Sequence, residues 1–303
     1  MKNSVSLTMT VYLCLLLLGS SGCIYMMHEP DLSDTNNDSI IPYTTLESIE
    51  TIEPTSNPKI ISPGDLEPNH NPTQDTSIIW SAGFEVYGLS EFHGLGDFTK
   101  QGSGAYTITP NISHSGKHSA ALSIDTSKSS DTGAHAANLV FWHQLPQEAY
   151  YYSAWYHIPA NVIPRDWWVI FEFMSTKVDG DLDPVYILDC VAYGRALKLQ
   201  LVYRPDKYDQ KIAYDQDIML VTTEKWFHIE MYYRRGQEND GQVVVWQDGV
   251  EIFNVKNTTT VLSGNEIFWH INNYTDYIQP NPNNIHVDDL IISSFRIGPD
   301  YFP

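Results

Sequence analysis

Alternating hydrophobic and polar residues dominate the second half of the chain. Residues 197–204 read Leu-Lys-Leu-Gln-Leu-Val-Tyr-Arg, so the three leucines lie on one face and Lys198 and Gln200 on the other. Residues 226–234 alternate in the same way. A period of two residues places one set of side chains in a core and the other set outside it, which is typical of a β-strand.

Nine segments carry such strand patterns and are rich in β-branched and aromatic residues. Within one of them, Asp248-Gly249 predicts a hairpin, because glycine tolerates a positive φ. We find no amphipathic helix longer than about two turns. The pattern therefore predicts an all-β fold, a jelly-roll sandwich of two antiparallel sheets. The nine segments are residues 133–145, 150–158, 167–174, 186–193, 196–204, 225–234, 242–255, 267–274 and 285–297.

The first 23 residues have a different character. Lys2 precedes an apolar run from Leu7 to Leu18, which is too short to span a membrane and suits a secretory signal. The run ends in Gly-Ser-Ser-Gly-Cys, which resembles the lipobox of bacterial lipoproteins. In that family the cysteine becomes the lipidated first residue of the mature chain, and Cys23 occupies its place. The resemblance implies an extracytoplasmic, membrane-anchored lipoprotein at the cell surface or the periplasmic face. The alternative is an ordinary signal peptide that leaves Cys23 as a plain thiol.

Residues 24–77 predict a disordered acidic linker. They are rich in Pro, Ser, Thr, Asn and acidic residues, contain Lys59 as their one lysine or arginine, and show no helix or strand period. Residues 78–303 then form one folded domain of the length of a large β-sandwich. Of the three cysteines only Cys190 falls within it, so this domain has no internal disulfide and depends on its core.

The net charge narrows the choice of partners. The chain has 17 Lys and Arg against 37 Asp and Glu, a formal charge of −20. Nucleic-acid binding depends on positive charge that neutralises phosphates, so nucleic acid is disfavoured as a partner. We expect the folded domain to be a monomer.

One strand carries an unusual set of polar residues. In residues 267–276, Ile267, Trp269 and Ile271 lie on one face and His270, Asn272 and Tyr274 on the other. A histidine, an amide and a phenol in a row indicate a face that points into a groove. Aromatic rings present a flat apolar surface with a polar tip, which suits the stacking of sugars, although most of the eight Trp and nineteen Tyr are expected to fill the core.

Several short segments, taken in their order along the chain, resemble the concanavalin A-like superfamily, which includes laminin-G-like lectin domains and jelly-roll polysaccharide lyases. The resemblance implies a concave sheet that binds polysaccharide in a groove, often with a structural calcium. The segments are Gly-Phe-Glu at 83–85 and residues 113–122, 226–233, 243–249 and 286–293.

The strand at 267–276 is similar to the late strand of jelly-roll alginate lyases that carries a basic residue and, four positions on, the catalytic tyrosine. His270 and Tyr274 occupy these places. The resemblance implies Tyr274 as base or acid, with His270 and His135 polarising the substrate carboxylate and Glu172 protonated or hydrogen-bonded to a neighbour. The residues that we expect to bind substrate are Asn138, Trp168, which shares the Glu172 face on a regular strand, Gln200, Arg204 and Asn272.

The sequence leaves the reaction open. A uronate lyase removes a proton α to a carboxylate and needs groups that offset the carboxylate charge. The lyases have Gln and His where this chain has Glu172 and Met174, and an ionised Glu172 would repel a uronate. The alternatives to a lyase are a non-catalytic module that binds polysaccharide, a structural or adhesion domain, and a glycoside hydrolase, which needs two carboxyl groups flanking one bond.

The resemblance also implies a calcium site made by an early Glu and a late Asp, which are Glu85 and Asp289 here. Calcium takes six to eight oxygen ligands. On a regular strand Asp288 and Asp289 face opposite ways, so only one of them could be a ligand. The alternative is that these acids are hydrogen-bonded to loop amides.

Overall fold

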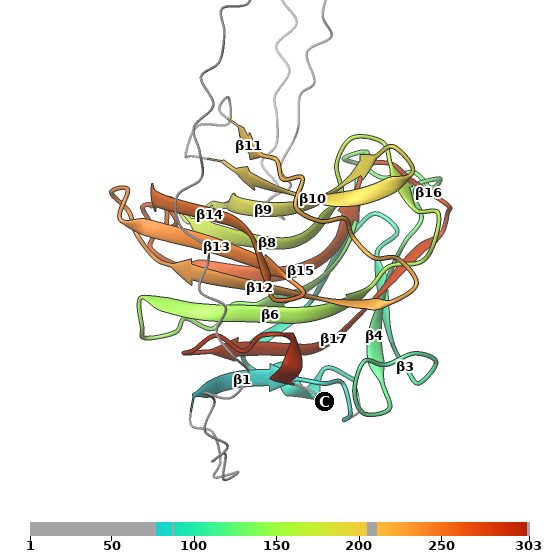
Figure 1. The fold of residues 1–303 in the computed structure, drawn as a ribbon, viewed down its shortest axis with the longest axis horizontal. Coiled ribbons are helices and arrows are strands. Elements are labelled where there is room, and N and C mark those ends of the chain that lie inside the picture. Colours follow the sequence, from blue (N-terminus) through green and yellow to red (C-terminus); the bar gives the residue numbers. More distant parts are fainter. Residues whose placement is uncertain (1–76, 87, 205–210, 302–303) are drawn as a thin grey trace, which may run out of the picture. The chain divides into compact units, whose positions relative to one another are not determined.

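The computed structural model describes residues 77–86, 88–204 and 211–301, which form two packed antiparallel sheets (Figure 1). The predicted signal peptide, Cys23 and the predicted linker up to residue 76 lie outside these residues. No helix within the described ranges is long and apolar enough to cross a membrane.

The seven-stranded sheet contains the strand that the sequence singled out. Its order is β11-β10-β9-β8-β15-β5-β2, so β15 lies in its interior between β8 and β5. The strands are β2 (Gly96–Gln101), β5 (His135–Phe141), β8 (Val169–Thr176), β9 (Leu182–Tyr193), β10 (Ala196–Tyr203), β11 (Ile212–Tyr214) and β15 (Ile267–Thr275).

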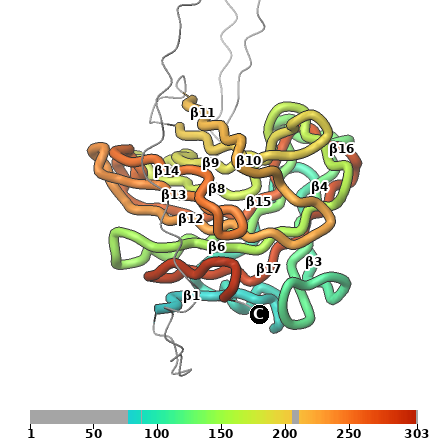
Figure 2. The backbone as a smooth tube through the Cα atoms, in the orientation of Figure 1, coloured from blue at the N-terminus to red at the C-terminus, as the bar shows by residue number. Residues whose placement is uncertain are grey.

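The eight-stranded sheet has the order β14-β13-β12-β6-β17-β4-β3, and β1 pairs with β17. The first and last long strands of the domain are therefore neighbours (Figure 2). The strands are β1 (Ile78–Ala82), β3 (Ala105–Thr109), β4 (Ser119–Ile124), β6 (Ala149–His157), β12 (Trp226–Arg234), β13 (Gly241–Gln247), β14 (Val250–Thr258) and β17 (Asn283–Ser293). The short elements are β7 (Ile163–Pro164), β16 (Ile278–Gln279), η1 (Ser90–Phe92) and η2 (Pro299–Tyr301).

The predicted jelly-roll sandwich is confirmed, and each of the nine segments contains a strand. The leucines of β10 at 197, 199 and 201 lie in the core, as the alternation indicates. The predicted hairpin joins β13 to β14, with positive φ at both Asp248 (47°) and Gly249 (79°). The strands β1 to β4 were not predicted.

Aromatic side chains from both sheets fill the core. Phe173 of β8 stacks on Tyr233 of β12 with ring centroids 3.9 Å apart. Tyr152 of β6 lies 4.8 Å from Phe173 and 5.3 Å from Trp269 of β15, edge to face. Burying one such side chain stabilises the fold by roughly 1.5–3 kcal/mol. Because these residues face inward, the alternate residues of β8 and β15 face outward.

A buried amide also joins the two sheets. The Oδ1 of Asn273 on β15 accepts a hydrogen bond from the indole of Trp168 at 2.9 Å. Its Nδ2 donates to the backbone oxygen of Leu122 on β4, also at 2.9 Å. Leaving such buried groups unpaired costs about 1–3 kcal/mol each. Asn273 therefore fixes the end of β15 against the opposite sheet.

A β-bulge changes which residues of β8 face outward. The register shifts between Val169 and Phe171 against β9, and between Ile271 and Tyr274 against β15. A bulge adds one residue and reverses the alternation beyond it. The prediction that Trp168 shares the Glu172 face is therefore wrong, since Trp168 is fully buried in the core.

Candidate functional site

Polar side chains gather on the face of the seven-stranded sheet that points away from the core. On β15, His270 lies opposite Glu172 of β8, and Asn272 opposite Asn138 of β5. Asp189 of β9 pairs with Val169 on one side and Gln200 on the other. We call this set the polar face, and it consists of Asn138, Glu172, Asp189, Gln200, His270, Asn272 and Tyr274.

Glu172 lies near the centre of the polar face and is only 7% exposed. Its Oε2 accepts a hydrogen bond of 3.0 Å from the Nδ2 of Asn272. The same oxygen lies 3.8 Å from the Nδ1 of His270, which is too long for a hydrogen bond. Burial raises the pKa of Glu172 to about 7, the bond from Asn272 lowers it, and the charge of Asp189 raises it further.

Burial also changes the ionisation of its neighbours. It lowers the pKa of His270 to about 4, so this imidazole is neutral at neutral pH. It raises the pKa of Asp189 to about 6, against the opposing charges of Lys211 and Arg204. The centre of the polar face therefore carries little positive charge and acids that ionise only near neutrality.

Four polar atoms of this face are buried and have no hydrogen-bond partner within the described structure. They are the Nε2 of His270 and one Oδ1 each of Asn138, Asp189 and Asn272. Buried polar atoms are almost always hydrogen-bonded, and each exception calls for an explanation. They are among several such atoms in the described domain, and a ligand with hydroxyl or carboxyl groups could supply the partners of these four.

Tyr274 lies at one end of the polar face, beside an apolar strip. It packs with Trp167 against the cluster of Val169, Ile187 and Val202. The rings of Trp167 and Tyr274 meet edge to face with centroids 4.9 Å apart. Since Tyr274 is four positions beyond His270, the polar side chains of β15 extend over ~13 Å along the strand. Such a length suits an extended chain as ligand.

Comparison with known proteins identifies the family. The family profile described as Polysaccharide lyase matches residues 85–290, which is well over half of the chain. The chain belongs to this Polysaccharide lyase family. The match runs from just after β1 to within β17 and so includes every residue of the polar face. A search of curated protein sequences found no match.

Solved structures of lyases share the fold of this family member. An endo-β-1,4-glucuronan lyase from the fungus Trichoderma reesei is 12% identical, with a TM-score of 0.58 over 74% of this chain and 99% of that chain. The alginate lyase vAL-1 from Chlorella virus is 11% identical, with a TM-score of 0.51 over 72% and 100%. A marine PL-14 alginate lyase from Aplysia kurodai is 12% identical, with a TM-score of 0.51 over 71% and 98%.

Besides Trp168, a second residue that was expected at the site lies elsewhere. His135 is 1% exposed, and its Nδ1 accepts a hydrogen bond of 3.0 Å from the backbone of Ser103 and lies 2.9 Å from the Ser103 hydroxyl. His135 and Asn138 are three residues apart on β5 and therefore face opposite ways. The prediction that His135 and Tyr274 act on one substrate is wrong for this reason.

The remaining predicted residues lie on or beside the polar face. The amide of Gln200 donates to the Oδ1 of Asp215 at 3.0 Å. Arg204 follows the end of β10, and its charge lowers the pKa of both Glu172 and Asp189, which places it near both acids. Met174 lies two residues from Glu172 on β8 and is only partly buried.

Sequence reasoning missed two residues of this region, Asp189 and Trp167. Asp189 is the lone acid in the apolar segment 186–193, and this signal could have revealed it. Trp167 gave no such signal, because only the bulge in β8 exposes it in place of Trp168.

The predicted calcium ligands lie at another place, around the loop 113–118. The φ of Asp289 is +46°, and the register of β17 against β6 shifts between Asp288 and Ile291. This bulge brings both acids to the same loop, so the prediction that they face opposite ways is wrong. The Oδ2 of Asp288 accepts from the backbone of His114 at 2.8 Å, and the Oδ2 of Asp289 lies 2.7 Å from the His114 Nδ1.

Glu85 binds the other half of this loop. Its Oε1 accepts backbone hydrogen bonds from Lys117 and His118 at 2.7 and 2.9 Å. Within the described ranges, no group of three or more His, Cys, Asp or Glu side chains is arranged to hold a metal ion. A calcium ion here would therefore need backbone carbonyl oxygens as further ligands. The hydrogen bonds themselves match the alternative of acids bonded to loop amides.

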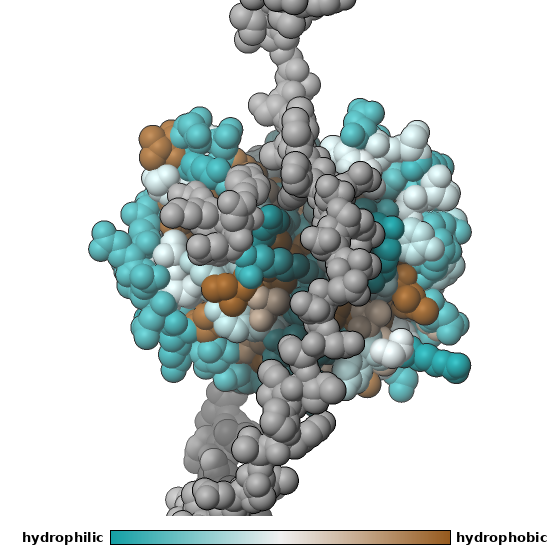
Figure 3. Space-filling view, turned by 90° about the horizontal axis from the view of Figure 1, so that it is seen from above, coloured by the Kyte–Doolittle hydropathy of each residue, from teal (hydrophilic) through white to brown (hydrophobic). Residues whose placement is uncertain are grey.

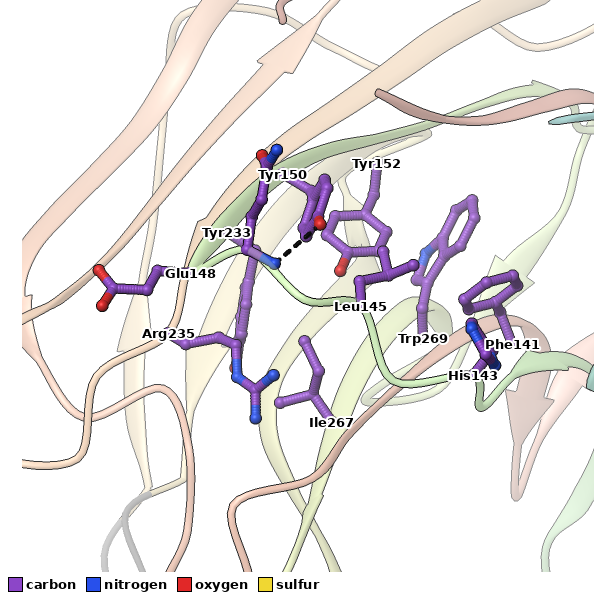
Figure 4. A pocket seen from close by; sticks show the side chains of 11 residues that line it. Phe141, His143, Leu145, Glu148, Tyr150, Tyr152, Tyr233, Arg235, Ile267 and Trp269 are labelled. Carbon is purple, nitrogen blue, oxygen red and sulfur yellow. Dashed lines mark hydrogen bonds between the residues drawn. The ribbon is translucent and has the colours of Figure 1, made fainter. Parts of the chain in front are cut away.

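A small cavity between the two sheets is not a sugar site. It lies where β5, β6, β12 and β15 meet at one end of the sandwich (Figure 4). Its volume of about 10 Å³ has room for no more than one water molecule. Phe141, Tyr150, Tyr152, Tyr233 and Trp269 form its inner wall.

The surface visible in Figure 3 presents hydrophilic residues over most of the described domain, with small separate hydrophobic patches. The described residues that the grey atoms leave visible on this side show no broad apolar area of the kind typical of a stable protein interface.

We predict that Glu172→Gln stabilises the protein in a pH-dependent way. A pKa raised from 4.5 to about 7 means that stability is fully present below pH 4.5 and is lost as the pH rises through 7. The amide cannot ionise, so at about pH 8 the variant should gain up to ~3 kcal/mol of unfolding free energy, and almost none at about pH 4. Urea unfolding at both pH values measures this. Glu251→Gln, on an exposed side chain of β14, is the control, and an equal gain at both pH values would contradict the prediction.

Proposed function

We propose that this protein binds a uronate-containing polysaccharide along the polar face and cleaves it by β-elimination. The observation that carries the proposal is the row of His270, Asn272 and Tyr274 on β15, with unpartnered polar atoms on two of the three residues. Membership of the Polysaccharide lyase family supports it. The names of the structural neighbours, a glucuronan lyase and alginate lyases, suggest acidic glycans as the substrate class.

The proposed reaction assigns roles to His270, Asn272 and Tyr274 of β15 and to Glu172 of β8. The C5–H bond of the uronate breaks, its electrons form the C4=C5 double bond, and the glycosidic C4–O bond breaks as the leaving oxygen gains a proton. Tyr274 moves one of these two protons, as the base that takes the C5 proton or as the acid that protonates the leaving oxygen, and water exchanges the other. His270 and Asn272, with Glu172 in its protonated form, offset the charge that develops on the carboxylate by hydrogen bonds.

A glycoside hydrolase is a second candidate because two carboxyl groups share the polar face. Glu172 and Asp189 lie on neighbouring strands, and burial raises the pKa of both. A glycosidase uses one protonated and one ionised carboxyl group on either side of the scissile bond. The products separate the candidates, because only a lyase creates a double bond conjugated to the carboxylate.

We also propose that the domain is tethered outside the cytoplasm by a lipid on Cys23. The apolar run and the Gly-Ser-Ser-Gly-Cys segment support this. Several acyl chains hold a protein at a membrane firmly, whereas one chain binds only marginally. A multiply acylated Cys23 followed by an acidic linker would keep the lyase domain attached to the membrane.

A structural calcium at the loop 113–118 is a further proposal. Glu85, Asp288 and Asp289 direct carboxylate oxygens to this one loop, whose carbonyl oxygens are a further type of ligand that calcium accepts. A bound ion would hold the domain's first turn and its last long strand together.

Tyr274→Phe tests the reaction. We expect it to lower the rate of cleavage of glucuronan or alginate by about 10²–10⁴-fold, because phenylalanine cannot transfer a proton. The ultraviolet absorbance of the new double bond measures the rate. Tyr232→Phe, on β12 of the other sheet, should retain activity.

Other results of this assay have clear meanings. Activity that survives in Tyr274→Phe would show that another group moves the proton. Binding without absorbance indicates a non-catalytic module, reducing ends without absorbance indicate a hydrolase, and no retention of any glycan would contradict the proposed function.

The lipid anchor predicts the mass of the mature N-terminus. In cells that process lipoproteins, we expect the first residue to be Cys23 carrying acyl chains. Mass spectrometry of the purified mature chain measures this, and Cys23→Ala should release the protein from the membrane fraction. A mature N-terminus with an unmodified or missing Cys23 would contradict the anchor.

Calcium should raise the melting temperature. We expect added calcium to stabilise the domain by about 1–3 kcal/mol when it is present at ten to a hundred times its dissociation constant, and EDTA to reverse the gain. Asp289→Asn should abolish the effect. A melting temperature that is the same in calcium and EDTA would contradict the site.

A further inference from the structure

The hydrogen bond between Asn272 and Glu172 determines what the centre of the polar face offers to a ligand. Asn272 is 1% exposed and lies between His270 and Tyr274 on the outward side of β15. Its Nδ2 donates to the Oε2 of Glu172 at 3.0 Å, and its Oδ1 has no partner. The amide is thus hydrogen-bonded at one end and unpartnered at the other.

The protonation of Glu172 decides which end is open. An ionised carboxylate only accepts hydrogen bonds, so it holds the NH₂ group of Asn272 and leaves the carbonyl oxygen for the ligand. A carbonyl oxygen accepts from sugar hydroxyl groups and repels a carboxylate. A protonated carboxyl group can instead donate to the Oδ1, and a 180° turn of the amide then presents the NH₂ group to the ligand.

We propose that Glu172 and Asn272 form one specificity-determining unit, which accepts a uronate carboxylate when Glu172 is protonated and excludes it when Glu172 is ionised. In the ionised state the unit presents a carbonyl oxygen and a negative charge, and neutral sugars remain acceptable to it. This inference rests on the proposed function, since it concerns how the same face selects a uronate.

The charges around Glu172 agree with such a unit. From β15 it faces the buried, neutral His270, which is too far away to form a hydrogen bond, and Tyr274 lies further along the strand. From β9 the charge of Asp189 opposes ionisation, and from the end of β10 the charge of Arg204 favours it. The charge of Lys211 lowers the pKa of Asp189. Burial outweighs the rest and raises the pKa of Glu172 to about 7, which is the range in which the unit would change state.

The test is the pH dependence of uronate affinity. Oligoglucuronate and oligoalginate are titrated calorimetrically into the full-length chain carrying Tyr274→Phe, which limits cleavage, at constant ionic strength. We expect the dissociation constant to rise about tenfold per pH unit above the midpoint, since only the protonated unit binds. Adding Glu172→Gln should make the dissociation constant independent of pH, because glutamine does not ionise and can donate to Asn272 at every pH. A neutral glucan oligosaccharide should show no such rise.

Asp189→Asn identifies the titrating group. If Glu172 titrates, removing the negative charge of Asp189 lowers the pH at which the dissociation constant begins to rise, but the rise itself remains. If the rise disappears in Asp189→Asn and persists in Glu172→Gln, the unit proposed here is wrong. A pH-independent affinity of the parent protein would also overturn it while leaving the lyase proposal intact. Failure to bind or cleave any uronate at any pH would instead refute the proposed function and this inference with it.

Discussion

The register of β15 between β8 and β5 is the constraint on which the polar face depends. Trp269 and Ile271 must face the core, where Trp269 contacts the rings of Phe171 and Tyr152. A slip of one residue would move these side chains to the outside and bring His270 and Asn272 into the core. The free energy of core packing therefore also fixes the positions of the polar side chains, and the site needs no separate support.

The same constraint explains how much the sequence could predict. Strand alternation gave the two-sheet fold and the shared face of His270, Asn272 and Tyr274, because a period of two is a local property of the chain. The bulges could not be foreseen, since they depend on how neighbouring strands pair. They account for the wrong placement of Trp168 and for the shared direction of Asp288 and Asp289. The burial that neutralises His270 is likewise a property of the packed sheet.

Burial also reconciles an acidic chain with a proposed acidic substrate. The formal charge of −20 opposes the approach of any polyanion at long range, although salt screens this repulsion beyond about 8–10 Å. At the polar face the local charge is what matters. There burial keeps the imidazole of His270 neutral, three amides carry no charge, and the raised pKa values of Glu172 and Asp189 reduce their negative charge.

The pairing of β1 with β17 has a mechanical consequence. Ser77 precedes β1, and its carbonyl oxygen accepts a hydrogen bond of 3.0 Å from the backbone of Ser294, just beyond β17. If the chain is pulled from its N-terminal side, the load enters the sandwich at β1 and reaches β17 through this antiparallel ladder. Both strands belong to the eight-stranded sheet, so this load enters the sheet that does not contain β15.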